Sequence, residues 1–249
     1  MYNPFSLQGK TILVTGASSG IGQATAIECS KMGAKLVITG RSVERLQETF
    51  EALEGDGHRQ VIADLVEQEG IESLVAQLPR LDGVALCAGI GMTVPVQFAT
   101  REKFDRVFNT NFFSQAELVR LVYKKKLLSS GSSVVFIASV GGITSFNYGN
   151  GIYGASKAAL NSYMKSCAYE LATRKIRVNS ICPGMVETPL IRRGTLTDEQ
   201  YQQYMQQYPL KRFGKPEEIA YSAVYLLSDA AAWITGTSLF VDGGGIIKG

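Results

Sequence analysis

Apolar residues along the chain follow two alternating patterns. One consists of short segments typical of strands at residues 11–14, 35–39, 59–63, 83–87, 134–138, 176–181 and 238–241, most of which are almost uninterrupted apolar runs; residues 59–63 and 176–181 also contain polar side chains. Runs without polar alternation are typical of strands that are buried on both faces of a parallel sheet. The other pattern has apolar positions three and four residues apart, and it predicts helices over residues 20–32, 42–53, 66–77, 100–128, 153–174, 198–208 and 216–228.

Repeated strand–helix units with short connections predict an α/β fold, in which a parallel sheet carries helices on both faces. No linker, charge run or change of composition divides the chain, so we expect one domain over residues 1–249. Residues 187–214 interrupt the alternation with Pro189, Gly194 and Pro209 around a helix rich in Gln and Tyr. Long insertions in a compact domain are usually lids or binding loops, and we expect a substrate lid here.

A glycine-rich turn follows the first predicted strand. Residues 15–22 read Thr-Gly-Ala-Ser-Ser-Gly-Ile-Gly and lead directly into the first predicted helix. Gly16 allows a tight turn, Gly20 allows a phosphate to approach the backbone, and Gly22 allows helix and strand to pack closely. The N-terminus of that helix offers free N–H groups and the positive end of its dipole to a pyrophosphate. The turn therefore predicts a dinucleotide-binding domain.

The end of the second predicted strand indicates which dinucleotide binds. An NAD site has a carboxylate about twenty residues past the glycine turn, where it binds the ribose 2′-hydroxyl. This chain has Gly40 there, followed by Arg41 and Ser42. A guanidinium can hold a 2′-phosphate through two charge-assisted hydrogen bonds, and Ser42 can add a hydroxyl donor. We therefore expect NADP(H); the alternative is that Arg41 only begins a solvated helix.

The stretch from Ser139 to Lys157 carries the candidate chemistry. Ser139 ends a buried strand, and Tyr153 and Lys157 are four residues apart, so they lie on one face of the following helix. A cation beside a phenol favours the phenolate and lowers the phenol pKa from about 10. A serine hydroxyl can hydrogen-bond the oxygen of a carbonyl or an alcohol. The three side chains together predict proton transfer to or from a substrate oxygen.

Composition and charge argue against several other classes of protein. The formal net charge of +3 is small for 249 residues and gives little support to nucleic-acid binding. No apolar run approaches 18 residues and no leader-like segment begins the chain, so we expect no membrane association. The four cysteines have no metal-like spacing, so we expect no metal site and reduced thiols in a cytoplasmic protein. The single histidine, His58, lies in a polar stretch, which leaves a hydrolase built on Ser139 without a base.

Taken together, these motifs resemble the main branch of the short-chain dehydrogenase/reductase family over essentially the whole chain. The resemblance implies a seven-stranded, doubly wound Rossmann domain with the nicotinamide at the carboxyl ends of the strands. The matching positions are residues 15–22, Asp64, Asn111, Ser139, Tyr153, Lys157, Pro183, Gly184 and residues 236–244.

The family pattern also implies a role for each matching position. Tyr153 is the expected acid/base, Lys157 is expected to lower its pKa and bind the nicotinamide ribose, and Ser139 to orient the substrate oxygen. Asn111 is expected to hold a helix kink and a water of the proton relay; the alternative is an asparagine that faces solvent. The cofactor contacts implied by the resemblance are Gly16, Ser18, Ser19, Gly20, Ile21, Gly22, Arg41, Ser42, Asp64, Leu65, Ala88, Gly89, Tyr153, Lys157, Pro183, Gly184, Val186 and Thr188.

One position departs from the family pattern. The family usually has Asn-Asn-Ala-Gly after the fourth strand, whereas this chain has Leu86-Cys87-Ala88-Gly89. The absent asparagine normally ties neighbouring strands together by hydrogen bonds. We therefore expect Cys87 to affect the local stability of the sheet more than the chemistry.

Residues 213–218 and 233–236 resemble bacterial 3-oxoacyl-carrier-protein reductases. The implied activity is NADP(H)-dependent interconversion of a carbonyl and a secondary alcohol on a small molecule, which a carrier protein could bear. Arg174 matches a position where those reductases present a basic residue to the carrier protein; the alternative is a cation at a helix end. A reductase of a sugar or another small ketone, and a catalytically silent dinucleotide-binding sensor or scaffold, remain as alternatives. The helices predicted over 100–128 and 155–174 have broad apolar faces, and we expect them to pack across a twofold axis in a homotetramer or a homodimer.

Overall fold

The strands form a single parallel sheet. The computed structural model describes residues 2–192 and 197–248. Within these ranges the strands occur in the spatial order β3-β2-β1-β4-β5-β6-β7, and every neighbouring pair is parallel. Their bounds are β1 (Thr11–Thr15), β2 (Lys35–Gly40), β3 (Arg59–Ile62), β4 (Leu81–Leu86), β5 (Leu128–Ile137), β6 (Arg177–Pro183) and β7 (Ser238–Val241). The expected doubly wound, seven-stranded α/β fold is therefore confirmed.

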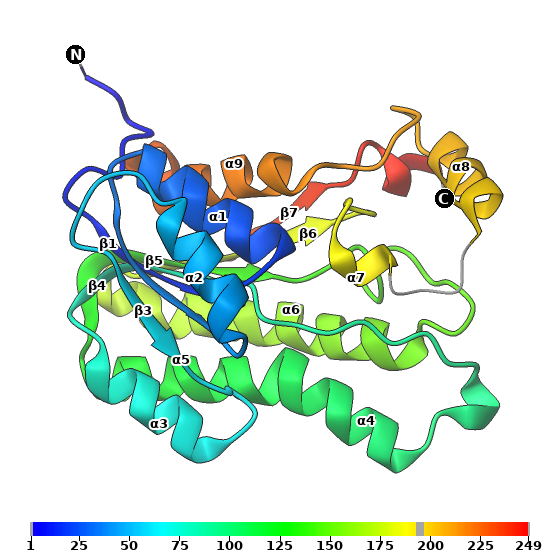
Figure 1. Cartoon of the computed structure of the whole chain (residues 1–249), viewed down its shortest axis with the longest axis horizontal. Helices are drawn as coiled ribbons and strands as arrows, with labels where there is room; N and C mark the ends of the chain where they lie inside the picture. Colours follow the sequence, from blue (N-terminus) through cyan, green and yellow to red (C-terminus); the bar gives the residue numbers. More distant parts are fainter. Residues whose placement is uncertain (1, 193–196, 249) are drawn as a thin grey trace.

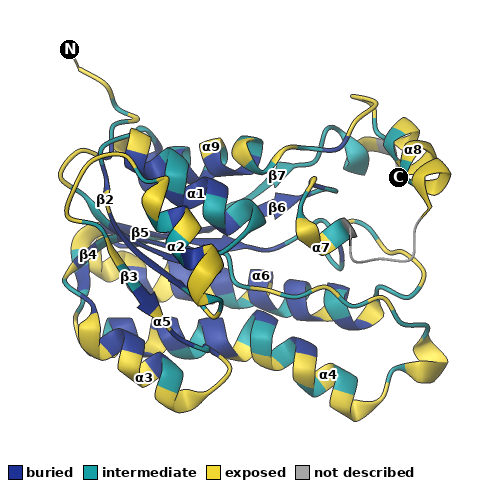
Figure 2. Ribbon diagram, in the orientation of Figure 1, coloured by how far each residue is buried: buried dark blue, intermediate teal, exposed yellow. Residues whose placement is uncertain are grey.

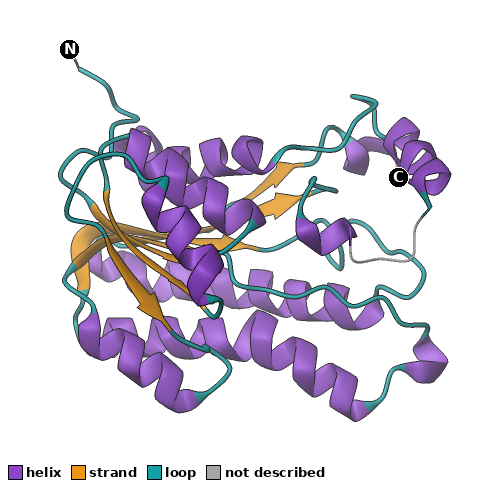
Figure 3. Ribbon diagram, in the orientation of Figure 1, coloured by secondary structure: helices purple, strands orange, loops and turns teal. Residues whose placement is uncertain are grey.

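Helices cover both faces of this sheet (Figure 1). Helices α1, α2 and α9 lie on one face, and α3, α4, α5 and α6 lie on the other, with the strands between the two layers (Figure 3). The α-helices in the described part of the chain are α1 (Gly20–Lys31), α2 (Val43–Glu51), α3 (Gln68–Gln77), α4 (Arg101–Phe108), α5 (Ser114–Lys124), α6 (Gly151–Leu171), α7 (Pro189–Arg192), α8 (Asp198–Gln207) and α9 (Pro216–Leu227).

Alternate strand residues supply two separate cores (Figure 2). In β1, Leu13 points to the α3–α5–α6 side, whereas Ile12 and Val14 point to the α1–α9 side. All three side chains are fully buried. Burial on both faces explains why the strands are continuous apolar runs rather than alternating ones. The strand order reverses between β1 and β4, and open α/β sheets bind ligands in a crevice outside the carboxyl ends of the strands at such a reversal.

The helix predicted over residues 100–128 was too long and too regular. The helix ends at Lys124, because the left-handed backbone of Lys126 (φ 57°) turns the chain and Leu128 already begins β5. Residues Asn109–Phe113 form a π-helical turn between α4 and α5. A π-turn contains one extra residue and widens the helix locally.

The expected lid over residues 187–214 contains two helices, α7 and α8. A capping box closes the start of α8: Gln200 N–H donates to the Thr197 hydroxyl, and Thr197 N–H donates to the Gln200 side chain. Residues 193–196 of the expected lid, including Gly194, lie outside the described residues.

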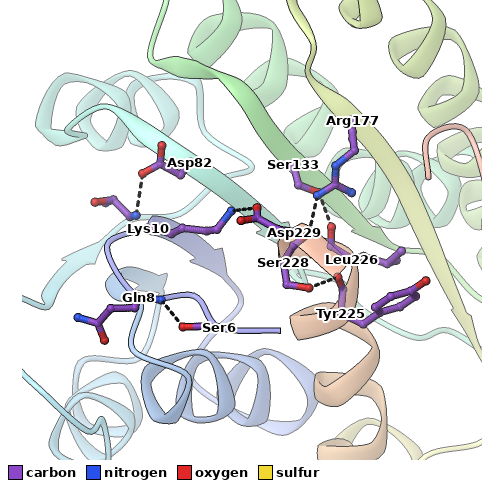
Figure 4. Close-up of polar contacts among 11 residues, drawn as sticks. Ser6, Gln8, Lys10, Asp82, Ser133, Arg177, Tyr225, Leu226, Ser228 and Asp229 are labelled. Atoms are coloured by element: carbon purple, nitrogen blue, oxygen red, sulfur yellow. Dashed lines mark hydrogen bonds and ion pairs between the residues drawn. The ribbon is translucent and has the colours of Figure 1, made fainter. Parts of the chain in front are cut away.

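Polar contacts hold the end of the sheet at which the strands begin, called here the amino-terminal edge (Figure 4). The half-buried Arg177 begins β6 and donates to the carbonyl of Ser228, 3.1 Å away, just past the end of α9. In β5, the Ser133 hydroxyl donates to the Leu226 carbonyl at 2.7 Å. Lys10 and Asp229 form a more exposed ion pair at 2.6 Å. Burial lowers the pKa of Arg177, so this guanidinium depends on its carbonyl partners.

We predict that Arg177→Met lowers the free energy of unfolding by about 2 kcal/mol. A hydrogen bond from a charged donor contributes about 1.5–3 kcal/mol, and its loss leaves the Ser228 carbonyl without that donor. Lys10→Met is the matched control, because an exposed ion pair contributes less than about 1 kcal/mol. Urea unfolding of both variants tests this, and equal losses would contradict the assigned role of Arg177.

Candidate active site

The glycine turn fits tightly against the end of β4. A Cβ on Gly16 would lie 2.8 Å from the backbone of Ala88, and one on Gly22 would lie 2.3 Å from the Gly16 carbonyl. Gly16 and Gly20 have positive φ angles of 63° and 55°. Both features require glycine. They leave the first turn of α1, with no side-chain cap at Ser19, facing the crevice.

Thr15 secures this contact in place of the absent asparagine. Its hydroxyl oxygen accepts hydrogen bonds from the N–H groups of Cys87 (3.1 Å) and Ala88 (3.2 Å). The backbone at Cys87 is therefore satisfied without a polar side chain at that position. Burial raises the pKa of the Cys87 thiol to about 12, so this thiol is protonated at neutral pH.

The residues that we expect to bind the adenine ribose and its 2′ substituent lie near the end of β2. A Cβ on Gly40 would lie 3.2 Å from Ser18, so glycine leaves room for that serine. Arg41 lies 3.7 Å from the Asp64 carboxylate, and both side chains are largely exposed. The Ser42 hydroxyl accepts from the Arg45 N–H at 3.4 Å and so caps α2.

Ser139 and Tyr153 meet at the carboxyl end of β5. The Ser139 oxygen accepts from the Gly141 N–H at 3.0 Å. Burial raises the pKa of Tyr153, and the nearby Ser139 hydroxyl opposes that rise. The lowering that we expected from Lys157 is absent: burial sets the direction of the shift, and Ser139 rather than Lys157 opposes it.

Lys157 is a buried cation with a backbone partner. Its ammonium donates to the Ile137 carbonyl at 2.7 Å and lies 5.9 Å from the centre of the Tyr153 ring. Burial lowers the pKa of Lys157 from 10.5 to about 8. The ammonium thus stands one helical turn from the phenol, as the spacing predicted, but it is turned toward the end of β5.

Asn111 lies inside the π-helical turn and is fully buried. Its Oδ1 accepts from the Ile90 N–H at 2.8 Å, and its Nδ2 donates to the Ile90 carbonyl and to the Ser156 hydroxyl, each at 3.0 Å. Ser156 in turn donates to the Tyr153 carbonyl at 2.7 Å. The solvent-facing alternative for Asn111 is wrong, and the expected kink is present as the wide turn.

The remaining predicted cofactor contacts surround the same crevice. Thr188 faces the glycine turn, because a Cβ on Gly20 would lie 3.1 Å from its methyl group. The Pro183 carbonyl accepts from the Val140 N–H at 3.1 Å, next to Ser139. Leu65 and Val186 are buried, and Val186 forms a bridge to Gly214. Ile21 packs against the core on the α1–α9 side.

The sequence did not predict the roles of two residues at the site: Thr15 anchors the backbone past β4, and Gln115 links that backbone to α5. The Gln115 Nε2 donates to the carbonyls of Ala88 (2.7 Å) and Asn111 (3.0 Å). A glutamine in an otherwise apolar helix face was the available signal, since buried amides require partners.

The residues present fit a dinucleotide. The cradle formed by Gly16, Gly20 and Gly22 has no space for side chains, and it places helix N–H groups at the crevice, where a pyrophosphate would bind. Arg41 stands just past the end of β2 and Asp64 just past the end of β3, where a ribose and adenine would lie.

Three other features bear on the site: the surroundings of His58, possible metal ligands and possible membrane-spanning helices. Both ring nitrogens of His58 bond backbone groups, Leu36 N–H and the Glu54 carbonyl, at the amino end of β2, far from Ser139 at a carboxyl end. Among the described residues, no three acidic, His or Cys side chains are grouped to hold a metal ion. Within the same ranges, no helix has the length and apolarity needed to span a membrane.

Comparison with known proteins gives the following similarities. Residues 16–245 match the family model described as enoyl-(acyl carrier protein) reductase. The chain is 36% identical to the 3-oxoacyl-[acyl-carrier-protein] reductase FabG of Rickettsia prowazekii, over 96% of this chain and 97% of that protein. A solved short chain dehydrogenase/reductase family protein, 34% identical, superposes with a TM-score of 0.86 over 97% of this chain and 99% of that one. A Beutenbergia cavernae structure with bound NADP, provisionally described as an NAD(P)-dependent gluconate 5-dehydrogenase, is 31% identical with a TM-score of 0.88, over 98% and 100% of the two chains.

We predict that dinucleotide affinity falls above pH 8. With a pKa of about 8, Lys157 is mostly neutral at pH 9, so the dissociation constant should rise about tenfold between pH 7 and pH 9. Between pH 8 and 10.5 Lys157 binds more protons in the unfolded chain than in the native one. Its contribution to the free energy of unfolding therefore increases as the pH rises, over the same range in which the affinity for the dinucleotide falls. Cofactor fluorescence and urea unfolding measure the two quantities.

Lys157→Met is the control for this titration. It should bind more weakly than the wild type at pH 7, and its affinity should change little up to pH 9. An equally steep pH dependence in this variant would assign the titration to another group.

Proposed function

The chain belongs to the short-chain dehydrogenase/reductase family, and from that premise we propose that it is an NADP(H)-dependent oxidoreductase that interconverts a carbonyl group and a secondary alcohol. The observation that supports this most directly is the convergence of Ser139, Tyr153 and Lys157 beside the glycine cradle. A silent sensor is the weaker candidate, because the complete set of proton-transfer side chains is present.

Each side chain of this set has a defined task in the proposed reaction. When bound, the nicotinamide supplies the hydride for reduction or accepts it in oxidation. Ser139 hydrogen-bonds the substrate oxygen and orients it toward Tyr153. Because burial raises the pKa of Tyr153, the phenol is protonated at neutral pH and can donate its proton to the oxygen of a carbonyl undergoing reduction. Lys157 binds the ribose, and its positive charge offsets the negative charge left on the phenolate.

We propose NADP(H) rather than NAD(H) because of the residues at the end of β2. Gly40 takes the position of the acidic residue that reads a 2′-hydroxyl, and the Arg41 guanidinium is 62% exposed and therefore accessible to a phosphate. Its ion pair with Asp64, at 3.7 Å, is longer than a charge-assisted hydrogen bond. A 2′-phosphate can therefore compete for Arg41.

A 3-oxoacyl thioester is the substrate that we favour. Residues 83–100 and 127–156, which include the two loops nearest Ser139, contain no Asp, Glu, Lys or Arg. The Val94 N–H donates to the Gly149 carbonyl at 2.7 Å and joins these loops, which also expose Val96, Phe98, Phe146 and Tyr148. An uncharged, partly aromatic wall suits a neutral acyl group better than a sugar acid.

The amino-terminal ends of the strands, about a strand length from Ser139, carry a basic surface that suits an acidic carrier protein as a docking partner. The turns before β4, β5 and β6 carry Arg80, Lys124–Lys126 and Arg174–Lys175, and the strand order places them side by side. Arg174 stacks on Tyr123 at 5.8 Å. A hollow of about 190 Å³ lies there, lined by Arg80, Leu128, Ser130, Thr173, Arg174 and Ile176.

The test of the proposed function is turnover by the full chain. A panel of 3-oxoacyl thioesters, free and carrier-bound, keto-sugars and simple diketones is followed by NADPH absorbance. Highest kcat/KM with a 3-oxoacyl thioester supports the proposal, preference for a keto-sugar transfers it to the sugar reductases, and no turnover of any ketone favours the sensor.

Tyr153→Phe should reduce kcat by at least about a hundredfold, because general acid catalysis contributes that much or more. NADPH binding should persist, since the phenyl ring keeps its place on α6. Steady-state kinetics with a titration of NADPH fluorescence separates the two effects, and near-normal turnover would remove Tyr153 from the mechanism.

Arg41→Ala should raise the KM for NADPH roughly tenfold to a hundredfold, the loss expected for a charged hydrogen-bonding partner worth about 1.5–3 kcal/mol. The KM for NADH should change little, because NADH has no 2′-phosphate. A wild type with the higher kcat/KM for NADH would contradict the cofactor assignment.

We also propose a homotetramer, or a homodimer, in the cytoplasm. Phe104, Phe113 and Tyr169 expose aromatic surface on the helices expected at the twofold axis, at 36%, 55% and 87%. All four cysteines are free thiols, as a reducing compartment requires. Sedimentation at micromolar concentration should show an oligomer that Phe113→Asp weakens, and a wild-type monomer would refute the assembly.

A further inference from the structure

We propose that Gln115 is a positioning residue for the reaction: its amide ties the end of β4 to the π-helical turn and thereby holds residues 88–90 beside Lys157. Position 115 is not among the residues that carry the family resemblance. The inference rests on the proposed function, because the segment that Gln115 holds belongs to the proposed cofactor site.

The orientation of the Gln115 amide follows from its partners. The side chain is fully buried, and Nε2 lies 2.7 Å from the Ala88 carbonyl and 3.0 Å from the Asn111 carbonyl. Carbonyl oxygens only accept hydrogen bonds, so the NH₂ group must face both of them. Its two hydrogens therefore bridge β4 and the wide turn.

Side chains from two consecutive residues stabilise the wide turn, but only one of them reaches the sheet. In this turn the Ser114 N–H bonds the Asn109 carbonyl, five residues back. The Ser114 hydroxyl donates to the Thr110 carbonyl at 2.8 Å, and Gln115 serves the Asn111 carbonyl in the same way. Ser114 acts within the helix, whereas Gln115 also bonds Ala88.

The segment that Gln115 holds lies beside the Lys157 ammonium. Three hydrogen bonds tie residues 88–90 to the wide turn and the start of α5: Gln115 donates to the Ala88 carbonyl, Asn111 donates to the Ile90 carbonyl, and the Ile90 N–H donates to Asn111. A Cβ on Gly89, in the middle of this segment, would lie 3.4 Å from the Lys157 Nζ. A shift of the segment therefore changes the surroundings of Lys157 directly.

The test compares Gln115→Met with Ser114→Ala at a temperature well below unfolding. Met keeps the length of the side chain and removes the amide, so the dissociation constant for NADPH should rise about tenfold and kcat with a 3-oxoacyl thioester should fall at least tenfold. Ser114→Ala loses a bond of the same turn without touching β4, so both values should stay within about twofold of wild type.

Gln115→Glu supplies a second, pH-dependent readout. A buried carboxyl group has a raised pKa, and in its protonated form it can donate one of the two lost hydrogen bonds. Its NADPH affinity relative to that of Gln115→Met should therefore increase from pH 8 to pH 6. Taking the ratio of the two variants at each pH cancels the titration of Tyr153, Lys157 and Cys87, which lie around this segment.

The possible outcomes separate the two proposals. Wild-type affinity and kcat in Gln115→Met, whatever its melting temperature, would show a structural role only and overturn this inference. If Gln115→Met does not fold, the NADPH affinity of Gln115→Glu is compared with that of the wild type. If the two proteins bind NADPH equally well at pH 6 and also at pH 8, the inference is overturned. If the wild type reduces no ketone, the proposed function fails, and the dissociation constants for the dinucleotide that the wild type binds still decide the role of Gln115.

Discussion

The contact between two backbones at the centre of the sheet sets the position of every group in the candidate site. The glycine turn after β1 meets the segment that follows β4 with no space for a methyl group at Gly16, and Thr15 accepts from two consecutive N–H groups just past β4. From this point α1 leaves toward one face of the sheet and α4 toward the other (Figure 1). The crevice exists because the two connections separate where the strands are closest.

Backbone atoms anchor the chemically important side chains around this contact. Lys157 bonds the carbonyl of Ile137, Asn111 bonds both backbone groups of Ile90, and Gln115 bonds the carbonyl of Ala88. Each partner lies at or just beyond the end of a strand whose own position is set by the sheet. The geometry of the candidate site thus depends little on the side chains of the neighbouring loops.

Periodicity and motif spacing were sufficient to predict the strands, most helices and the meeting of Ser139, Tyr153 and Lys157. They were insufficient at Asn109–Phe113, because a π-turn changes the helical register by one residue and leaves the apolar spacing nearly unchanged. The roles of Thr15 and Gln115 depend on side-chain bonds to distant backbone, which no local pattern encodes. The pKa of Tyr153 is raised by burial, which is known only once the chain is folded, and the expected effect of the neighbouring cation is not found.

The amino-terminal ends of the strands carry stabilising contacts, and the carboxyl-terminal ends carry the candidate site. This separation affects which substitutions the protein can tolerate. Arg177 and Ser133 fasten the amino-terminal edge through carbonyls at the end of α9, about a strand length away from the reacting side chains. Substitutions at sites so far apart contribute almost additively to stability. The amino-terminal edge can therefore accumulate stabilising substitutions that compensate for destabilising changes in the entrance loops. Such a reserve allows a single scaffold to diverge toward new substrates without losing its fold.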